Sequence, residues 1–186
     1  VQEAMANTAI FLDRDGTLIN DPGYLNHPDQ VQLLEGAAEA LRELRGLGYK
    51  TVVVSNQSGV ARGIVTEEML GKIHERLREL LAAKGATLDK VYYCPYHPDG
   101  VVEQYRKDSD LRKPKPGMLL AAARDMEIDL AKSWMIGDAE RDIEAGRSAG
   151  CRTILVSAAR SEYGIPDKCR PDYVAVNMRE AVNIIK

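Results

Sequence analysis

Short apolar segments alternate with segments of helical periodicity along the 186 residues of the chain, and this alternation limits the fold more than any other feature. The expected strands are 9–12, 51–54, 91–93, 134–136, 153–156 and 173–176. The expected helices are 37–47, 67–83, 117–126, 141–149 and 178–185. Strands that alternate with helices form a mostly parallel sheet with helices on both faces. We therefore predict an α/β fold with a Rossmann-like, three-layer α/β/α arrangement.

Residues that begin and end helices occur where this assignment needs them. Thr66, which is followed by two glutamates, is typical of a helix N-terminus. Glycines, which often end helices, follow three of the expected helices at Gly48, Gly85 and Gly150.

Length and composition indicate one globular domain over residues 1–186. The net charge of −3, with acids and bases mixed, excludes the basic surface of a nucleic-acid binder. No apolar run reaches the ~20 residues of a membrane span. The cysteines are few and far apart, which suits a reducing cytoplasm. We expect a cytoplasmic monomer that binds a small molecule, with residues 1–7 as a disordered or vector-derived tail.

Two irregular stretches interrupt the alternation. Residues 95–114 are rich in proline, aspartate, glycine and lysine, and residues 22–30 form a shorter stretch of the same kind. Because a loop of such length inside a compact domain is usually functional, we expect residues 95–114 to lie near the substrate.

Two carboxylates follow the first expected strand. Asp13 and Asp15 are two residues apart, so their side chains point to the same side of an extended segment. Like charges at that spacing repel, and the pair calls for a cation or a shared proton. Ligands of open α/β sheets bind at this end of the strands.

Three further segments place polar side chains at the ends of strands or the starts of helices. Residues 52–57 end in a hydroxyl and two amides, 112–117 carry adjacent cations, and 135–138 end in Asp138, with Asp142 four residues later. Each segment alone has an ordinary explanation as a turn, a helix cap or a solvated surface. A shared catalytic site is excluded only if each of these separate explanations is correct, so we favour a shared site.

Together these four segments resemble the four motifs of the haloacid dehalogenase (HAD) superfamily of phosphohydrolases, from about Ile10 to Val156. The resemblance implies a HAD-like domain. No large cap domain is expected, because only loops are available to cover the site. The resemblance also implies a bound metal ion that has the backbone carbonyl of Asp15 among its ligands.

The residue types fit phosphoryl transfer. A magnesium ion held by Asp13 and Asp138 would offset the repulsion between a carboxylate and a phosphate dianion. Asp13 would then attack phosphorus and form an aspartyl-phosphate. Asp15 would protonate the leaving oxygen and later accept a proton from water. Lys113 and Ser55 would stabilise the phosphoryl oxygens. Asp142 would not bind the metal ion directly but would act on it through its ligands or through water.

The flanking residues resemble one branch of the superfamily, the phosphatases of heptose 1,7-bisphosphate and of histidinol phosphate. The flanks that carry this likeness are 21–24, 55–63, 92–98 and 112–114. The resemblance implies removal of the 7-phosphate of D-glycero-D-manno-heptose 1,7-bisphosphate. The residues it implies for substrate binding are Asp21, Pro22, Gly23, Tyr24, Asn56, Gln57, Ser58 and Arg112. Arg112 is suited to a bidentate contact with a second phosphate.

The branch often has a structural zinc in the long loop, held by a Cys-x-His pair and a Cys-x-Cys pair. Here Cys94 occupies the first position, but Tyr96, Ser109 and Leu111 occupy the other three. His97 lies one residue away and cannot alone restore four ligands. Because tetrahedral zinc needs four donors, we expect no structural zinc.

Alternatives remain open at this point. Ala139 stands where the heptose enzymes often have a substrate-binding lysine. The substrate is therefore open between heptose bisphosphate, histidinol phosphate and another small phosphomonoester. A catalytically weak sugar-phosphate binding protein on the same fold is a further alternative. Dehalogenation is disfavoured by Asp15, because a halide leaving group needs no proton.

Overall fold

The computed structural model describes residues 6–157 and 167–186. Its named strands form one sheet in the order β3-β2-β1-β4-β5-β6, and every pairing between them is parallel. The strands are β1 (Ala9–Leu12), β2 (Lys50–Asn56), β3 (Lys90–Cys94), β4 (Trp134–Gly137), β5 (Arg152–Val156) and β6 (Tyr173–Ala175). The predicted parallel sheet is confirmed.

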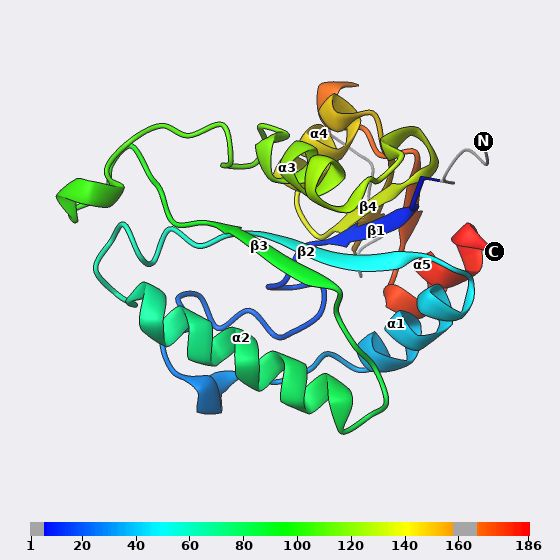
Figure 1. Ribbon diagram of the computed structural model, residues 1–186, viewed down its shortest axis with the longest axis horizontal. Coiled ribbons are helices and arrows are strands. Elements are labelled where there is room, and N and C mark those ends of the chain that lie inside the picture. The colour runs from blue at the N-terminus through cyan, green and yellow to red at the C-terminus, as the bar shows by residue number, and fades with distance from the viewer. Residues whose placement is uncertain (1–5, 158–166) are drawn as a thin grey trace.

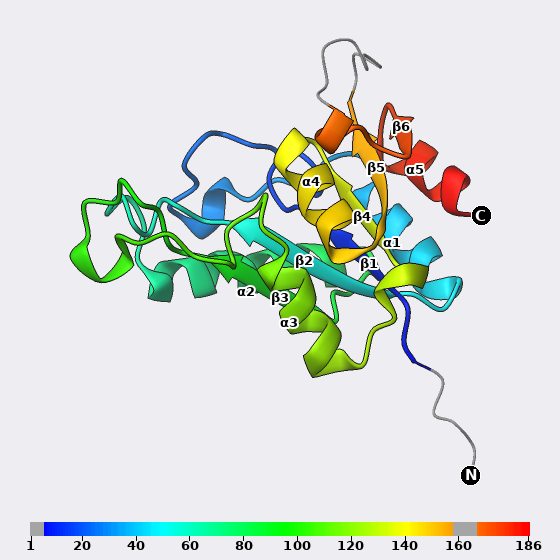
Figure 2. The same cartoon turned by 90° about the horizontal axis from the view of Figure 1, so that it is seen from above.

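Helices cover both faces of the sheet (Figure 1). One face carries α1 (Ala37–Gly46), α2 (Glu67–Ala82) and α5 (Met178–Ile185). The opposite face carries α3 (Gly117–Met126) and α4 (Glu140–Ala149), as the view from above also shows (Figure 2). This arrangement is the predicted three-layer α/β/α fold.

The core consists of two apolar layers, one on each side of the sheet. Ile10 and Leu12 of β1 contribute to the layer under α1, α2 and α5. Phe11, on the other face of the same strand, packs in the layer that includes α3. All three side chains are fully buried. The alternation of β1 side chains between two covered faces explains why this strand is apolar throughout.

No helix in the two described ranges combines the length and the apolarity needed to cross a bilayer.

One strand is longer than the sequence predicts, because its last residues are polar. The second strand was expected to end at residue 54, but β2 continues to Asn56. Ser55 pairs with Tyr93 and Asn56 with Cys94, so the sheet extends this strand through polar residues. The strand therefore delivers both polar side chains to the carboxyl edge in fixed register.

The long loop, residues 95–114, is held by hydrogen bonds to neighbouring elements. The Val102 N–H donates to the Ala61 carbonyl at 3.0 Å, and the Tyr105 hydroxyl donates to Glu67 of α2 at 2.7 Å. A short 3-10 turn, Glu103–Tyr105, lies between these contacts.

Only part of the expected N-terminal tail can be compared with the prediction. Residues 1–5 lie outside the described residues. Asn7 is bonded through its backbone to Glu127 and Asp129, at 2.9 and 2.8 Å.

The N-terminus of α2 depends on one cap. Thr66 Oγ1 accepts the backbone N–H of Met69 at 3.1 Å. Thr66→Ala removes that acceptor, and we expect the free energy of unfolding to fall by about 1 kcal/mol. Chemical denaturation measures the change, with Thr66→Ser as the matched control. Equal stability of the alanine and serine variants would contradict the capping role.

Candidate active site

The sheet register brings the first and fourth motifs side by side. Leu12 of β1 pairs with Val53 of β2 on one side and with Ile136 of β4 on the other. Asp13 follows Leu12 directly, and its N–H donates to the Ile136 carbonyl at 3.0 Å. The carboxyl ends of β1, β2 and β4 therefore meet at one place on the sheet edge.

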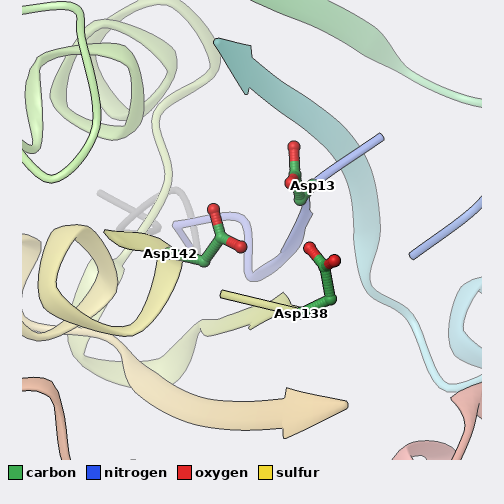
Figure 3. Close-up of side chains that lie close together, drawn as sticks. All are labelled: Asp13, Asp138 and Asp142. Carbon is green, nitrogen blue, oxygen red and sulfur yellow. The ribbon is translucent and has the colours of Figure 1, made fainter. Parts of the chain in front are cut away.

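Three carboxylates converge there (Figure 3). Asp13, Asp138 and Asp142 each offer one oxygen, and these oxygens lie within 4.8 Å of one another. Desolvation and the charges of Asp13 and Asp142 raise the pKa of Asp138 to about 7. Burial likewise raises the pKa of the Asp142 carboxyl. Burial and the neighbouring carboxylates therefore both oppose ionisation of Asp138 and Asp142.

Lys113 supplies the positive charge within this group. Its Nζ lies 3.0 Å from Asp13 Oδ1 and 2.7 Å from Asp142 Oδ1, and it donates to the Val54 carbonyl at 2.7 Å. Burial opposes the charged form, but the two carboxylates raise the pKa of Lys113 above its ordinary value. Lys113 is therefore a buried ammonium ion with fixed partners.

The side-chain amide of Asn56 fixes the backbone that carries this lysine. Asn56 Oδ1 accepts the Lys113 N–H at 3.0 Å, and Asn56 Nδ2 donates to the Lys113 carbonyl at 2.9 Å. Asn56, which the sequence assigned to substrate binding, thus also joins β2 to the third motif.

The donor set fits a magnesium ion. All available ligand atoms are oxygens, which Mg²⁺ prefers. Asp13 Oδ1 accepts the Arg14 N–H at 2.8 Å, whereas Asp13 Oδ2 has no hydrogen-bond donor within the described part of the chain. Gly16 has φ +79°, and a Cβ there would overlap the Asp138 carboxylate. The close approach of this backbone leaves the carboxylate oxygens directed to a common space.

The Asp15 carboxylate lies next to these aspartates and accepts hydrogen bonds from the side chains of Arg14 and Gln57. Arg14 Nε and Nη2 donate to its two oxygens at 2.9 and 3.0 Å. Gln57 Nε2 also donates to Asp15, at 3.1 Å, and to Ser55 Oγ at 2.6 Å. Ser55 and Asp15 are thus bridged by one amide.

An open pocket of about 270 Å³ lies over these groups. Asp13 lines it although the residue is only 3% exposed, so the carboxylate remains reachable. Most of the predicted substrate residues line the same pocket, whereas Pro22 does not. The predicted lining residues are Asp21, Gly23, Tyr24, Asn56, Gln57, Ser58 and Arg112.

Arginines make one side of this pocket positive. Desolvation lowers the pKa of Arg112, and the charges of Arg141 and Arg62 lower it further. Arg112 Nη1 and Arg62 Nε are buried without a hydrogen-bond partner among the described residues. Arg141 lines the pocket as well. Guanidinium groups that keep buried N–H donors without a partner are typical of an anion site.

Comparisons with known proteins agree with this geometry. The HAD-hydrolase-like family model matches residues 110–181. A D-glycero-β-D-manno-heptose-1,7-bisphosphate 7-phosphatase of Photorhabdus laumondii is 50% identical over 153 residues, which are 82% of this chain and 81% of that protein. The phosphatase of the same name from Pasteurella multocida is 44% identical over 96% of both chains.

A solved structure extends the likeness to three dimensions. The D,D-heptose 1,7-bisphosphate phosphatase of B. bronchiseptica, complexed with magnesium and phosphate, superposes with a TM-score of 0.81 at 31% identity. The match covers 96% of this chain and 97% of that one. The chain belongs to the HAD superfamily, in the family of the heptose-bisphosphate phosphatases.

Sequence reasoning did not find three residues of this phosphatase's site. Arg141 was passed over although it lies between two motif carboxylates, Asp138 and Asp142. Arg14 lies inside the first motif, and His74 falls on the apolar face of α2 with Leu70, Ile73, Leu77 and Leu81. For both arginines the available signal was a position between two motif carboxylates, whereas the sequence indicated only a surface or packing role for His74.

The residues at the zinc positions of the family make protein contacts instead. Cys94 is fully buried, and burial raises the pKa of its thiol. Tyr96 and Leu111 pack against the core layer around Cys94, and Ser109 Oγ accepts the Leu111 N–H at 3.2 Å. His97 Nδ1 accepts the Asp99 N–H at 3.0 Å. That the loop holds no structural zinc stays a prediction.

The raised pKa of Asp138 predicts a pH-dependent stability. In chelator, the folded protein binds this proton more tightly than the unfolded chain does. Stability therefore falls as pH rises from about 4 to about 7, and the ionised carboxylate destabilises the fold above that range. Asp138→Asn should raise Tm at pH 8.5 in chelator and remove the increase in Tm that magnesium gives the wild type. Differential scanning calorimetry measures both effects. A lower Tm for the variant in chelator would contradict the electrostatic account.

Proposed function

We propose that this phosphatase removes the 7-phosphate of D-glycero-D-manno-heptose 1,7-bisphosphate through an aspartyl-phosphate on Asp13. The observation that carries the proposal is one pocket lined both by the carboxylates Asp13 and Asp15 and by the guanidinium groups of Arg112 and Arg141. A substrate with a reacting phosphate and a second anion matches both kinds of group. The named activity of the relatives supports the same substrate.

In the first step, an oxygen of Asp13 forms a bond to phosphorus while the bond from phosphorus to the sugar oxygen breaks. Lys113 holds Asp13 Oδ1 and leaves the other oxygen for the attack. Asp15 gives its proton to the departing sugar oxygen. Ser55 Oγ and the Lys113 ammonium lie at the end of β2, where they stabilise charge on the phosphoryl oxygens.

In the second step, water attacks phosphorus and the bond to Asp13 breaks. Asp15, now ionised, accepts the proton of that water, which returns both carboxylates to their starting states. The same residue thus serves as acid and then as base.

Magnesium bound by Asp13, Asp138 and the Asp15 carbonyl would neutralise the phosphoryl charge and so permit attack by an anion. Asp142 is engaged by Lys113 and by the Ala139 N–H at 3.1 Å, so we assign it to holding the site rather than to binding the ion directly. The magnesium and phosphate of the B. bronchiseptica structure support this choice of ion.

Product identification tests the reaction. ³¹P NMR should show loss of the 7-phosphate and retention of the 1-phosphate. Turnover of histidinol phosphate at a comparable kcat/KM would overturn the substrate assignment.

The nucleophile has its own test. Asp13→Asn should lower phosphate release by more than about 10³-fold while leaving Tm close to the wild-type value. Asp125→Asn is the matched control, because Asp125 is bonded to Lys90 and Tyr92 at the opposite edge of the sheet. Activity of Asp13→Asn equal to that of the control would show that another residue attacks phosphorus.

The position of Arg112 in the pocket predicts a selective defect. Arg112→Lys keeps the charge but cannot make a bidentate contact, so KM for the bisphosphate should rise about tenfold. KM for a sugar monophosphate that lacks the second phosphate should change little. Steady-state kinetics on the two esters gives the comparison. An equal rise for both would remove Arg112 from recognition of the second phosphate.

A further inference from the structure

The Arg14 side chain is buried in a place where a solvated arginine would be expected. The residue is 1% exposed, although it lies between Asp13 and Asp15 of the catalytic motif. Its guanidinium donates to both oxygens of Asp15. A planar fork that engages both oxygens fixes the plane of a carboxylate as well as its position.

The other side of the guanidinium has partners from two distant segments. Arg14 Nη2 donates to Gln57 Oε1 at 2.9 Å, and Nη1 lies 3.1 Å from His74 Nε2. His74 is 4% exposed and comes from the middle of α2. Burial, with the charges of Arg14 and Arg78, lowers the pKa of His74 to about 3. The ring is therefore neutral and accepts the hydrogen bond from Arg14.

The contacts form a closed arrangement around the catalytic acid. Gln57 accepts from Arg14 and donates to Asp15, so the three side chains hold one another. A buried salt bridge of this kind does not by itself show a contribution to stability. It does fix geometry, and proton transfer to a leaving group depends strongly on the position of the acid.

We propose that Arg14, itself held by His74 and Gln57, is the positioning residue that aligns Asp15 for proton transfer. Helix α2 thereby supports the acid–base step without contacting the substrate. The inference rests on the proposed function, in which Asp15 protonates the leaving oxygen. The proton still passes from Asp15 to the sugar oxygen, and Arg14 keeps its own protons throughout.

The test compares esters that differ in their need for an acid. A sugar phosphate leaves as a poor alkoxide and needs a proton, whereas 4-nitrophenolate leaves without one. His74→Leu keeps apolar packing but removes the acceptor that holds Arg14. Both esters share the second step, in which Asp15 acts as base, so the comparison uses kcat/KM, which reports the first step. We expect His74→Leu to lower kcat/KM on the sugar phosphate by about 10–100-fold and on 4-nitrophenyl phosphate by less than about threefold.

Two further variants separate positioning from general damage. His74→Gln retains an acceptor oxygen and should recover most of the lost kcat/KM. Glu75→Gln, the exposed neighbour on α2, should match the wild type on both esters. Equal losses on the two esters for His74→Leu would overturn the proposal, because a purely structural defect reduces both activities together.

A double-mutant cycle keeps the inference testable if His74→Leu does not fold. Arg14→Lys keeps a buried charge but loses the fork. In an Asp15→Asn background, Arg14→Lys should cause no further loss of kcat/KM on the sugar phosphate. Full additivity would refute a role that acts through Asp15.

The result of the positioning test does not depend on which sugar phosphate is the substrate. The comparison is made on whichever alkyl phosphate the wild type hydrolyses fastest. If that ester is not heptose bisphosphate, the proposed sugar is wrong and the positioning test proceeds unchanged. If heptose bisphosphate is hydrolysed but the variants show no leaving-group dependence, only the positioning role fails.

Discussion

The buried Lys113 ammonium is the interaction on which the active-site arrangement depends. Asp13, Asp138 and Asp142 place oxygens within 4.8 Å of one another, an arrangement that repulsion would otherwise disfavour. Lys113 pairs with two of these residues and leaves Asp138 with a raised pKa. Three ionised carboxylates and one ammonium carry a net charge of −2, which one divalent cation balances. The charge of these four side chains therefore matches that of one divalent cation.

Two buried cations serve the two catalytic carboxylates in different ways. Lys113 is a compact charge that can face Asp13, Asp142 and the Val54 carbonyl at once. Arg14 presents a planar fork to Asp15 and shares its remaining donors with neutral groups. A point charge suits a nucleophile that must keep one oxygen free. A fork suits an acid whose direction matters more than its net charge. Because each carboxylate has its own cationic partner, the nucleophile and the acid have different surroundings although they are only two residues apart.

The fold and the catalytic edge could be read from the sequence because both depend on local patterns. Apolar runs such as 9–12 and helical periodicity located nearly every element, and the sheet then forced Asp13 and Asp138 together. The contact between Arg14 and His74 joins residues 60 positions apart and could not be read in this way. No local sequence pattern distinguishes a histidine that only packs in the core from one that holds an arginine in position. The ion pair between Lys113 and Asp142 likewise depends on how the segment before α3 meets helix α4, so the sequence supplied the residues but not their pairing.

Helix α2 connects the substrate side of the site to its acid. Near its N-terminus, Glu67 accepts the hydroxyls of Tyr105 from the long loop and Tyr93 from β3, at 2.7 and 2.8 Å. Two turns later His74 accepts from Arg14, and its ring lies 5.7 Å from that of Tyr93. One rigid element thus fixes both the loop that borders the pocket and the residue that orients Asp15. Such shared support reduces the reorganisation needed when substrate binds, because the acid is already aligned.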